Sequence, residues 1–450
     1  MPSTGLLTDR YELTMLDAAL QDGSGDRRCV FEVFARSLPE GRGYGVVAGT
    51  SRLLDALGRF SFGDEQLRYL EDAGVVSPTT LDWLATYRFT GDIYGYREGE
   101  LYVPDSPILT VVGSFAETVL LESLVLSILN HDSAVASAAA RMVQAAGGRP
   151  LMEFGSRRTH EDAAVAAARA AVLVGFAGTS NLEAGRRHGV PTLGTSAHAF
   201  TLLHDDEASA FDAQVATQGS GTTLLVDTYD VAEGVERAIR AGGPELGGIR
   251  IDSGDLADHA VAARGQLDAA GLTGTRIVVS GDLDEYRIAS LADAPIDGYG
   301  VGTSVVTGSG APAAGMVYKL VARASGGSGD LEVVAKSGGD KATVGGQKAA
   351  SRRLADGVAT AEVLQPWGSP PDPDARPLQT PLVIDGQVVD QPDLEAATAH
   401  HRMAIGELSP EARSLQAARP GFPTLVLADA PLEHPTRPRT APSATPEGIR

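Results

Sequence analysis

Cysteine, membrane-length apolar runs and positive charge are all scarce in this chain of 450 residues. Cys29 is the only cysteine, which excludes an internal disulfide and any metal cluster built from thiolates. No apolar run reaches 18 residues, because Glu122 and Arg169 interrupt the two most apolar stretches. The chain does not open with a basic segment followed by an apolar one, so we expect a cytoplasmic protein with no membrane partner.

The shortage of positive charge limits the possible partners. The chain has 37 Lys and Arg against 58 Asp and Glu, a formal net charge of −21. Phosphate backbones are held by clustered positive charge, so this balance argues against a nucleic-acid partner. An anionic substrate would require positive side chains that are gathered in one place. With 43 % hydrophobic residues and many glycines, the composition is that of an ordinary soluble α/β protein of two or three domains.

A regular alternation of strand-like and helical patterns fills the middle of the chain. The strand-like runs end near Phe154, Ala177, Thr195, Asp227, Asp252, Gly281 and Gly302. The clearest helical patterns between them cover 161–172, 231–241, 255–270 and 283–292. Because such units are typical of parallel strands with crossover helices, we predict an irregular seven-stranded parallel β/α barrel over 113–310.

The alternation stops after Ser304, and a helical, strongly apolar pattern over 115–146 precedes it. We therefore predict a second α/β domain that is formed jointly by the segments 1–112 and 311–429. The last residues, 430–450, are rich in Pro, Thr and Ala, which indicates a disordered tail.

The stretch 191–200 (PTLGTSAHAF) predicts a buried strand that carries His198 at its carboxyl end. A lone histidine is more often structural than catalytic, and this stretch alone leaves both possibilities open. The other predicted strands also end in glycine, hydroxyl or charged residues, and in barrel enzymes these ends converge on one face. Helix capping would explain the Ser, Thr, Asp and Gly residues, but it does not explain Arg157, Arg158 and Arg250.

Three features at these ends suit an anionic ligand, and each has a plainer explanation. Arg157 and Arg158 could clamp a phosphate or carboxylate, or could form surface ion pairs. The turn at 300–303 could bind phosphate through its backbone N–H groups, although glycine-rich turns are common. Asp252 and Asp255 could bind ribose hydroxyls or Mg²⁺, although Asp255 could simply cap the next helix. The chain has no P-loop and no dinucleotide-binding glycine motif.

The four lysines of the chain all lie within thirty residues, at Lys319, Lys336, Lys341 and Lys348. Every other basic side chain except histidine is an arginine. Lysines retained only in this glycine-rich segment are consistent with flexible contacts to phosphate, and equally with a solvated hairpin.

Taken together, the strand ends resemble those of the nicotinate phosphoribosyltransferase family over roughly residues 5–355. The resemblance is carried by separated motifs at 7–11 (LTDRY), 154–158 (FGSRR), 194–198 (GTSAH), 225–229 (LVDTY), 250–255 (RIDSGD), 301–306 (VGTSVV) and 317–320 (VYKL). It implies an enzyme that joins nicotinate to 5-phosphoribosyl-1-pyrophosphate and couples this reaction to ATP hydrolysis, with Mg²⁺ as cofactor. It also implies a homodimer whose subunits share the active site.

The resemblance assigns roles to individual residues. His198 matches a histidine that ATP phosphorylates, while Arg250 and Asp252 match the residues that hold the base and the ribose diol. Phe154 and Tyr11 match aromatic residues on either side of the pyridine ring, with Tyr11 coming from the partner subunit. The other matches that imply substrate contacts are Arg157, Arg158, Thr195, Ser253, Gly254, Gly281, Asp282, Gly302 and Thr303. Phosphate or ATP contacts across the dimer are implied for Arg36, Lys319, Lys336, Lys341 and Lys348.

An acidic residue at position 180 would repel the carboxylate of nicotinate. The neutral Ser180 therefore favours nicotinate over nicotinamide. Two departures from the family pattern, Ser156 and the pair at 345–346, concern the shape of loops. The alternatives that remain are a nicotinamide or quinolinate phosphoribosyltransferase, and a non-catalytic sensor that binds nucleotide or phosphoribosyl pyrophosphate.

Overall fold

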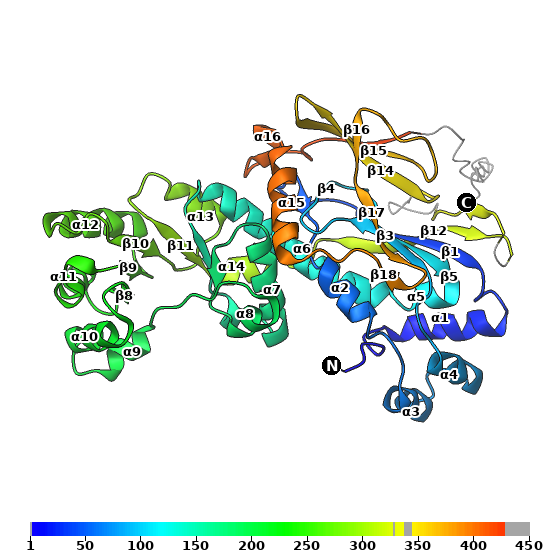
Figure 1. The fold of residues 1–450 in the computed structure, drawn as a ribbon, viewed down its shortest axis with the longest axis horizontal. Helices are drawn as coiled ribbons and strands as arrows, with labels where there is room; N and C mark the ends of the chain where they lie inside the picture. Colours follow the sequence, from blue (N-terminus) through cyan, green and yellow to red (C-terminus); the bar gives the residue numbers. More distant parts are fainter. Residues whose placement is uncertain (1, 327–328, 337–343, 428–450) are drawn as a thin grey trace, which may run out of the picture.

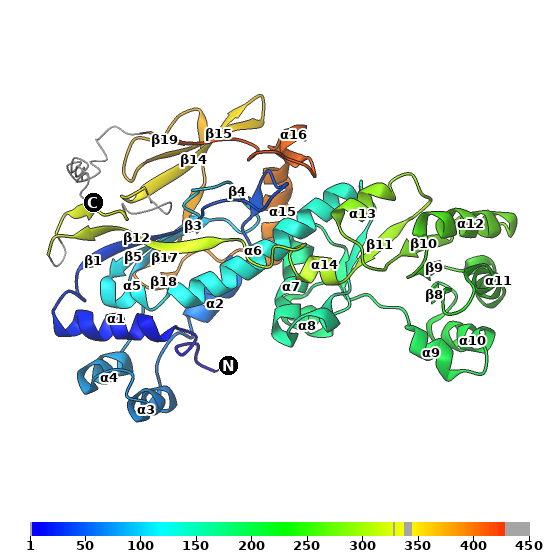
Figure 2. The same cartoon turned by 180° about the vertical axis from the view of Figure 1, so that it is seen from behind.

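The computed structural model describes residues 2–326, 329–336 and 344–427, which form two lobes lying side by side (Figure 1). Each lobe has a β-sheet at its centre, and a long helix joins the two (Figure 2). This helix, α6 (Glu122–Ala145), contributes side chains to the apolar cores of both lobes. None of the described helices combines the length and the apolar character that crossing a bilayer would require.

The larger lobe contains an antiparallel sheet of seven strands, in which strands from late in the chain flank three early strands on both sides. In spatial order these are β13 (Leu331–Val333), β12 (Met316–Ala324), β1 (Arg28–Ala35), β5 (Leu109–Ser114), β3 (Asp92–Tyr96), β17 (Gln379–Ile384) and β18 (Gln387–Val388). The first helix and the beginning of α6 contribute to the apolar core of this lobe. Leu13 and Leu16 of the first helix are buried there.

Smaller sheets and helices complete the larger lobe. A four-stranded sheet has the order β16 (Ala375–Pro377), β14 (Lys348–Ala355), β15 (Val358–Pro366) and β19 (Thr424–Val426), and β2 (Gly45–Val46) pairs with β4 (Leu101–Tyr102). The helices are α1 (Arg10–Gln21), α2 (Thr50–Leu57), α3 (Asp64–Asp72), α4 (Pro78–Ala85), α5 (Phe115–Val119), α15 (Leu394–Gly406) and α16 (Pro410–Arg413). The single helix predicted over 115–146 is therefore two helices, which meet at Leu120 and Leu121.

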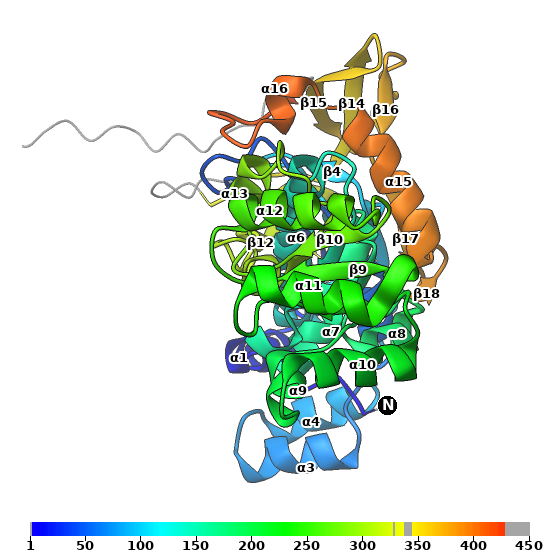
Figure 3. The same ribbon diagram turned by 90° about the vertical axis from the view of Figure 1, so that its left-hand side faces the viewer.

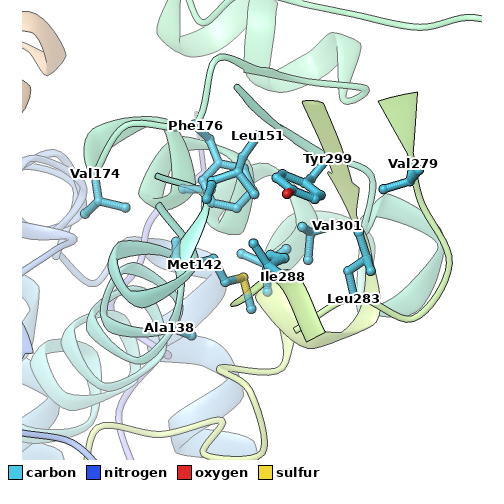
Figure 4. Close-up of a cluster of buried hydrophobic side chains, with 14 of the residues drawn as sticks. Ala138, Met142, Leu151, Val174, Phe176, Val279, Leu283, Ile288, Tyr299 and Val301 are labelled. Carbon is cyan, nitrogen blue, oxygen red and sulfur yellow. The ribbon is translucent and has the colours of Figure 1, made fainter. Parts of the chain in front are cut away.

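The smaller lobe is built on six parallel strands. Their spatial order is β7 (Gly178–Thr179), β6 (Leu151–Glu153), β11 (Gly298–Val301), β10 (Arg276–Val279), β9 (Gly248–Ile251) and β8 (Thr223–Leu225). This is the order of a β/α barrel that is open between β7 and β8. Buried side chains from α6 and from these strands fill its core, including Met142, Leu151, Tyr299 and Val301 (Figure 4).

The connecting segments are mostly helical, as the sequence pattern predicts. They are η1 (Ser156–Arg158), α7 (Glu161–Leu173), α8 (Leu182–His188), α9 (His198–Leu203), α10 (Glu207–Gln218), α11 (Val231–Gly242), η2 (Gly243–Glu245), α12 (Leu256–Ala269), α13 (Glu285–Ser290) and α14 (Thr303–Val306). Helices α10, α11 and α12 lie side by side along the outside of the lobe (Figure 3). Helix α11 shows the local signals that form these helices. The side chain of Asp230 caps it, and its buried face presents Val235 and Ala238 to the core.

The prediction of a seventh strand ending at Thr195 is wrong, because the described parallel sheet has six strands. Residues 191–197 form one isolated bridge, from Thr192 to Thr179, and the side chains from Pro191 to Gly194 are exposed. The segment lies beside β7 but pairs with no described strand on its other side. A strand needs neighbouring strands to satisfy its backbone groups. After residues 191–197 the chain continues through α9 and α10, and β8 then joins the opposite edge of the sheet, beside β9. The α/β class itself is confirmed.

Candidate active site

Two adjoining hollows open at the carboxyl ends of the parallel strands. The first, of about 440 Å³, is lined by Phe154, Arg157, Ser180, Arg250, Asp252 and the residues 194–199. The second, of about 170 Å³, shares Phe154, Arg157 and Asp252 with the first and adds Arg158, Ser280, Gly281, Asp282, Gly300, Gly302 and Thr303. Because three residues line both, a ligand in one hollow would lie beside a ligand in the other.

His198 lies in the first hollow, but as the first residue of α9 rather than at the end of a strand. Its Nδ1 atom is 3.1 Å from Oγ1 of Thr228, and its Nε2 atom is 4.0 Å from Oδ1 of Asp227. The Asp227 side chain is only 1 % exposed. Its Oδ2 atom accepts hydrogen bonds from the Asp252 backbone N–H and the Ser253 hydroxyl, at 2.9 and 2.6 Å. Its Oδ1 atom has no hydrogen-bond partner among the described residues, so this oxygen is left to His198.

Asp227 and Thr228 were not among the predicted site residues, although both belong to a motif that carried the resemblance. The available signal is their position, two and three residues after the end of the buried strand β8. The sequence alone does not show that they lie against a histidine thirty residues earlier.

Arg250 projects from β9 and supports the segment that carries His198. It donates hydrogen bonds to Oγ1 of Thr195 at 2.8 Å and to the carbonyl oxygen of Ser196 at 3.2 Å. Burial lowers the pKa of its guanidinium, and the carboxylates of Asp252 and Asp227 partly offset this effect. Its Nε atom is buried and has no partner among the described residues. In the loop beside the open edge of the sheet, residues 191–193 bond to β7, whereas Thr195 and Ser196 are held by the Arg250 side chain.

Glycine is required at two positions around the second hollow. Gly281 has φ of +111°, and a Cβ atom there would lie 2.2 Å from the carbonyl oxygen of Asp252. At Gly300 a Cβ atom would lie 2.6 Å from Cε2 of Phe154, so the absence of a side chain at this position of β11 makes room for the ring. The neighbouring Asp282 also has positive φ, 46°, which turns it toward this hollow.

The structure brings together most of the predicted barrel residues and leaves two aside. Ser253 and Gly254 lie in the loop after β9 and line neither hollow. The Ser253 hydroxyl instead donates a hydrogen bond to Asp227.

The residues predicted to reach phosphates lie in the larger lobe and line neither hollow of their own chain. Lys348 is buried, with its ammonium 2.6 Å from Oε2 of Glu32. Lys319 lies 3.9 Å from a carboxylate oxygen of Glu122. Lys336 is exposed after β13, and Lys341 lies outside the described residues.

Tyr11 lies in the larger lobe as well, on α1, and its side chain is 45 % exposed. Partial burial and a hydrogen bond to Glu122 raise the pKa of its phenol. Arg36 lines a third hollow of about 780 Å³, between the loop after β1 and the segment 415–420. A contact of Tyr11, Arg36 or the lysines with the strand-end hollows would need a second subunit.

Oxygen ligands are available in the hollows, although the structure shows no dedicated metal centre in its described part. Among residues 2–326, 329–336 and 344–427, no group of three or more His, Cys, Asp or Glu side chains is placed to hold a metal ion. Asp252 and Asp282, which line the second hollow, are carboxylates of the kind that bind Mg²⁺ together with substrate phosphates.

The fold and the site define an α/β-barrel protein whose strand ends can receive an anionic, phosphate-bearing ligand. Comparison with known families makes this more specific. The N-terminal domain of nicotinate phosphoribosyltransferase matches residues 6–130, and the nicotinate phosphoribosyltransferase family matches residues 150–311. The chain belongs to the nicotinate phosphoribosyltransferase family.

Individual relatives agree with this assignment. The chain is 57 % identical over 432 residues to Mycobacterium tuberculosis nicotinate phosphoribosyltransferase pncB1, covering 93 % of this chain and 94 % of that protein. It is 39 % identical over 356 residues to the Bacillus subtilis nicotinate phosphoribosyltransferase, covering 77 % and 72 %. The crystal structure of human nicotinic acid phosphoribosyltransferase superposes with a TM-score of 0.79 at 26 % identity, covering 93 % and 97 %.

Proposed function

We propose that this chain transfers the 5-phosphoribosyl group of phosphoribosyl pyrophosphate to the ring nitrogen of nicotinate, giving nicotinate mononucleotide and pyrophosphate. This reaction belongs to pyridine nucleotide salvage, for which we propose a cytoplasmic location. The observation that carries the proposal is the pair of adjoining hollows that share Phe154, Arg157 and Asp252. One hollow suits a flat anionic base, and the other suits a ribose phosphate beside it.

The residues of the two hollows support a displacement at the anomeric carbon. The ring nitrogen forms a bond to this carbon while the bond to pyrophosphate breaks, and positive charge develops on the ribose. Phe154 provides an aromatic face for the base, and Asp252 faces both hollows, where it can hold the ribose and stabilise this charge. No general base is needed, because the pyridine nitrogen already carries a lone pair.

The second hollow fits the 5-phosphate end of the substrate. Gly302 and Thr303 lie at the start of α14, where unpaired backbone N–H groups favour an anion. Arg157 and Arg158 add positive charge at its rim. Asp252 and Asp282 would bind Mg²⁺ together with the pyrophosphate, where the ion would neutralise charge on the leaving group.

His198 is proposed to accept a phosphoryl group from ATP. A neutral imidazole has one nitrogen with a free lone pair, which makes it a competent nucleophile. Thr228 contacts Nδ1 at 3.1 Å and the free oxygen of Asp227 lies 4.0 Å from Nε2, so these two side chains orient the ring. Added charge at His198 would act on the loop that Arg250 holds, and so on the base pocket.

Ser180 supports nicotinate as the base rather than nicotinamide. It lines the first hollow with a neutral hydroxyl, so this side of the pocket does not repel a carboxylate. Arg157 and Arg250 provide positive charge in the same hollow. Quinolinate carries a second carboxylate, and the assay below separates the three bases.

We further propose a homodimer in which each larger lobe completes the site of its partner. Exposed apolar side chains on α1 and the preceding loop, Leu7, Tyr11 and Met15, support an interface there. Around the barrel mouth, Leu193, Leu202 and Leu203 are exposed as well. Together these surfaces could bring Tyr11 against the base of the other subunit.

The deciding experiment is a chromatographic assay of nucleotide formation from phosphoribosyl pyrophosphate with nicotinate, nicotinamide or quinolinate, each with and without ATP. We expect nicotinate mononucleotide as the main product and a stimulation by ATP. Exclusive use of nicotinamide or quinolinate would overturn the assignment of the base. A lack of any ATP effect would overturn the coupling while leaving the transfer itself intact.

A sensor that binds nucleotide without catalysis is the second candidate, and γ-labelled ATP separates it from the enzyme. We expect the wild-type protein to take up acid-labile label and the His198→Ala protein to take up none. If His198→Ala takes up label like the wild type, the assigned role of His198 is wrong.

A further inference from the structure

Glu153 is a fully buried carboxylate directly below the candidate active site, and none of the roles above uses it. It is the last residue of β6, next to Phe154, and its side chain is not exposed to solvent. No positively charged side chain of the described residues forms an ion pair with it. Burial raises the pKa of this carboxyl group, and hydrogen bonds from Thr179 and from the backbone N–H of Gly155 offset the effect only in part.

Both oxygens of this carboxylate are used, and they connect two strand ends. Oε1 accepts the backbone N–H of Gly155, in the turn that follows Phe154. Oε2 accepts the hydroxyl of Thr179, on β7, at 2.5 Å. The same hydroxyl oxygen accepts the backbone N–H of Asn181 at 2.9 Å, so the contact extends to both sides of Ser180.

This connection matters because β7 is weakly supported. It is two residues long and is the last strand at the open edge of the sheet. On its outer side, its backbone pairs within the described part of the chain only with the exposed segment 191–193, through Thr192 and its neighbours. The position of Ser180 relative to Phe154 therefore depends mainly on the links to β6.

We propose that Glu153 and Thr179 are positioning residues that set the spacing between Phe154 and Ser180, and with it the fit of the pyridine base. This inference rests on the proposed function, since it concerns the base site of that reaction. A buried carboxylate without a counter-ion costs stability, and an apolar pair could fill the same space at lower cost. Because this carboxylate lowers the stability of the fold, we assign it a role in the adjoining site.

The test is a set of three threonine variants whose steady-state kinetics are compared for both substrates. Thr179→Val keeps the shape of the side chain but removes the hydroxyl, whereas Thr179→Ser keeps the hydroxyl. The matched control is Thr275→Val, just before β10 and therefore at the amino ends of the strands, where a buried hydroxyl donates to the carbonyl oxygen of Leu246 at 2.8 Å. All three are also compared in thermal unfolding.

We expect Thr179→Val to raise the KM for nicotinate about tenfold, the effect of losing one buried hydrogen bond to a charged group. The KM for phosphoribosyl pyrophosphate should stay within about twofold, because no residue of β7 or of the loop after it lines the second hollow. Thr179→Ser should behave like the wild type. Thr275→Val should lose thermal stability without a change in either KM.

Glu153→Gln provides an independent variant should Thr179→Val fail to fold. Its amide has only one acceptor oxygen for the two donors, so we expect a rise in the KM for nicotinate in the same direction. In the double variant Glu153→Gln/Thr179→Val the two effects should not add, because both break one contact.

The inference is wrong if Thr179→Val leaves the KM for nicotinate unchanged, if both KM values rise together, or if Thr179→Ser is as impaired as Thr179→Val. These results differ from a failure of the proposed function, in which the wild-type protein itself forms no nicotinate mononucleotide.

Discussion

Asp227 has one carboxylate oxygen that accepts two hydrogen bonds and another that is left without a partner beside His198. At the scale of single residues, this asymmetry is the most informative feature of the site. The bonded oxygen fixes the orientation of the carboxylate, so the free oxygen is held in place by the loop that follows β9. An oriented acid of this kind stabilises positive charge on an imidazole.

Asp227→Asn should therefore reduce labelling of His198 by γ-labelled ATP by at least about tenfold, since the neutral amide no longer stabilises charge on the ring. Asp230→Asn is the matched control. Asp230 lies three residues later and caps α11, a role that asparagine also fills. Equal labelling in wild type and Asp227→Asn would contradict the role given to Asp227.

Ser180→Asp tests the choice of base at the same scale. A carboxylate at the wall of the first hollow should repel nicotinate, so its KM should rise at least about tenfold. The KM for nicotinamide should fall or stay constant. Ser180→Asn adds similar bulk without charge and is the control. If both variants affect nicotinate equally, size rather than charge decides the selectivity.

At the scale of elements, the helices of the smaller lobe are specified strongly by their own sequence. The predicted helices over 161–172 and 231–241 correspond to α7 and α11 within one residue at each end. Their spacing of apolar residues and their capping residues are local signals. The segment 191–195 has a strand-like sequence but lacks a second neighbour, and no local signal reports on that.

The strand β11 offers a prediction at this scale, because Phe154 lies against its glycine. Gly300→Ala should displace the ring and raise the KM for nicotinate, since the added methyl group would stand 2.6 Å from Cε2 of Phe154. Gly298→Ala is the control on the same strand, where the nearest atom to a Cβ would lie at 3.3 Å. If both variants behave alike, the loss reflects the strand and not the ring.

At the scale of the whole molecule, a buried arginine on α6 connects the two lobes. The Nε atom of Arg141 is 3.0 Å from Oε1 of Glu285, on α13 of the smaller lobe. Its Nη1 atom donates to the carbonyl oxygen of Gly41, and its Nη2 atom to that of Leu415, at 2.8 and 2.9 Å. One side chain thus binds an early segment, a barrel helix and a late segment of the chain.

Arg141→Met should destabilise the protein by about 3–5 kcal/mol in chemical unfolding, because Glu285 would remain buried without its partner. The double variant Arg141→Met/Glu285→Gln should recover part of this loss. An effect below about 1 kcal/mol for Arg141→Met alone would show that the lobes are held together by other contacts.

Subunit mixing tests the proposed shared site. Tyr11→Ala and His198→Ala should each lack ATP-stimulated activity alone, and co-expression in equal amounts should restore about a quarter of the wild-type ATP-stimulated activity. This fraction follows because half of the dimers are mixed and each mixed dimer has one intact site. If no activity returns although mixed dimers are isolated by two affinity tags, Tyr11 and His198 do not act in one site across subunits.

Several residues show where sequence-based inference reached its limit. Lys348 is close to the other lysines in the sequence, whereas the fold pairs its ammonium with Glu32, more than 300 residues away. Asp227 and Glu153 were visible only as polar residues at strand ends. Their partners are His198 at the start of α9 and Thr179 at the end of β7, and no periodic pattern reports such contacts.

The sequence by itself determined the α/β class, the order of the strand ends and the family to which the chain belongs. Apolar periodicity, capping residues and short motifs are local properties, and each can be recognised from a few neighbouring residues. Only the tertiary structure decided that the sheet stays open at residues 191–197, that Asp227 faces His198, and that Tyr11 lies away from the hollows of its own chain. These features depend on which distant segments meet, and that is settled by packing of the whole chain.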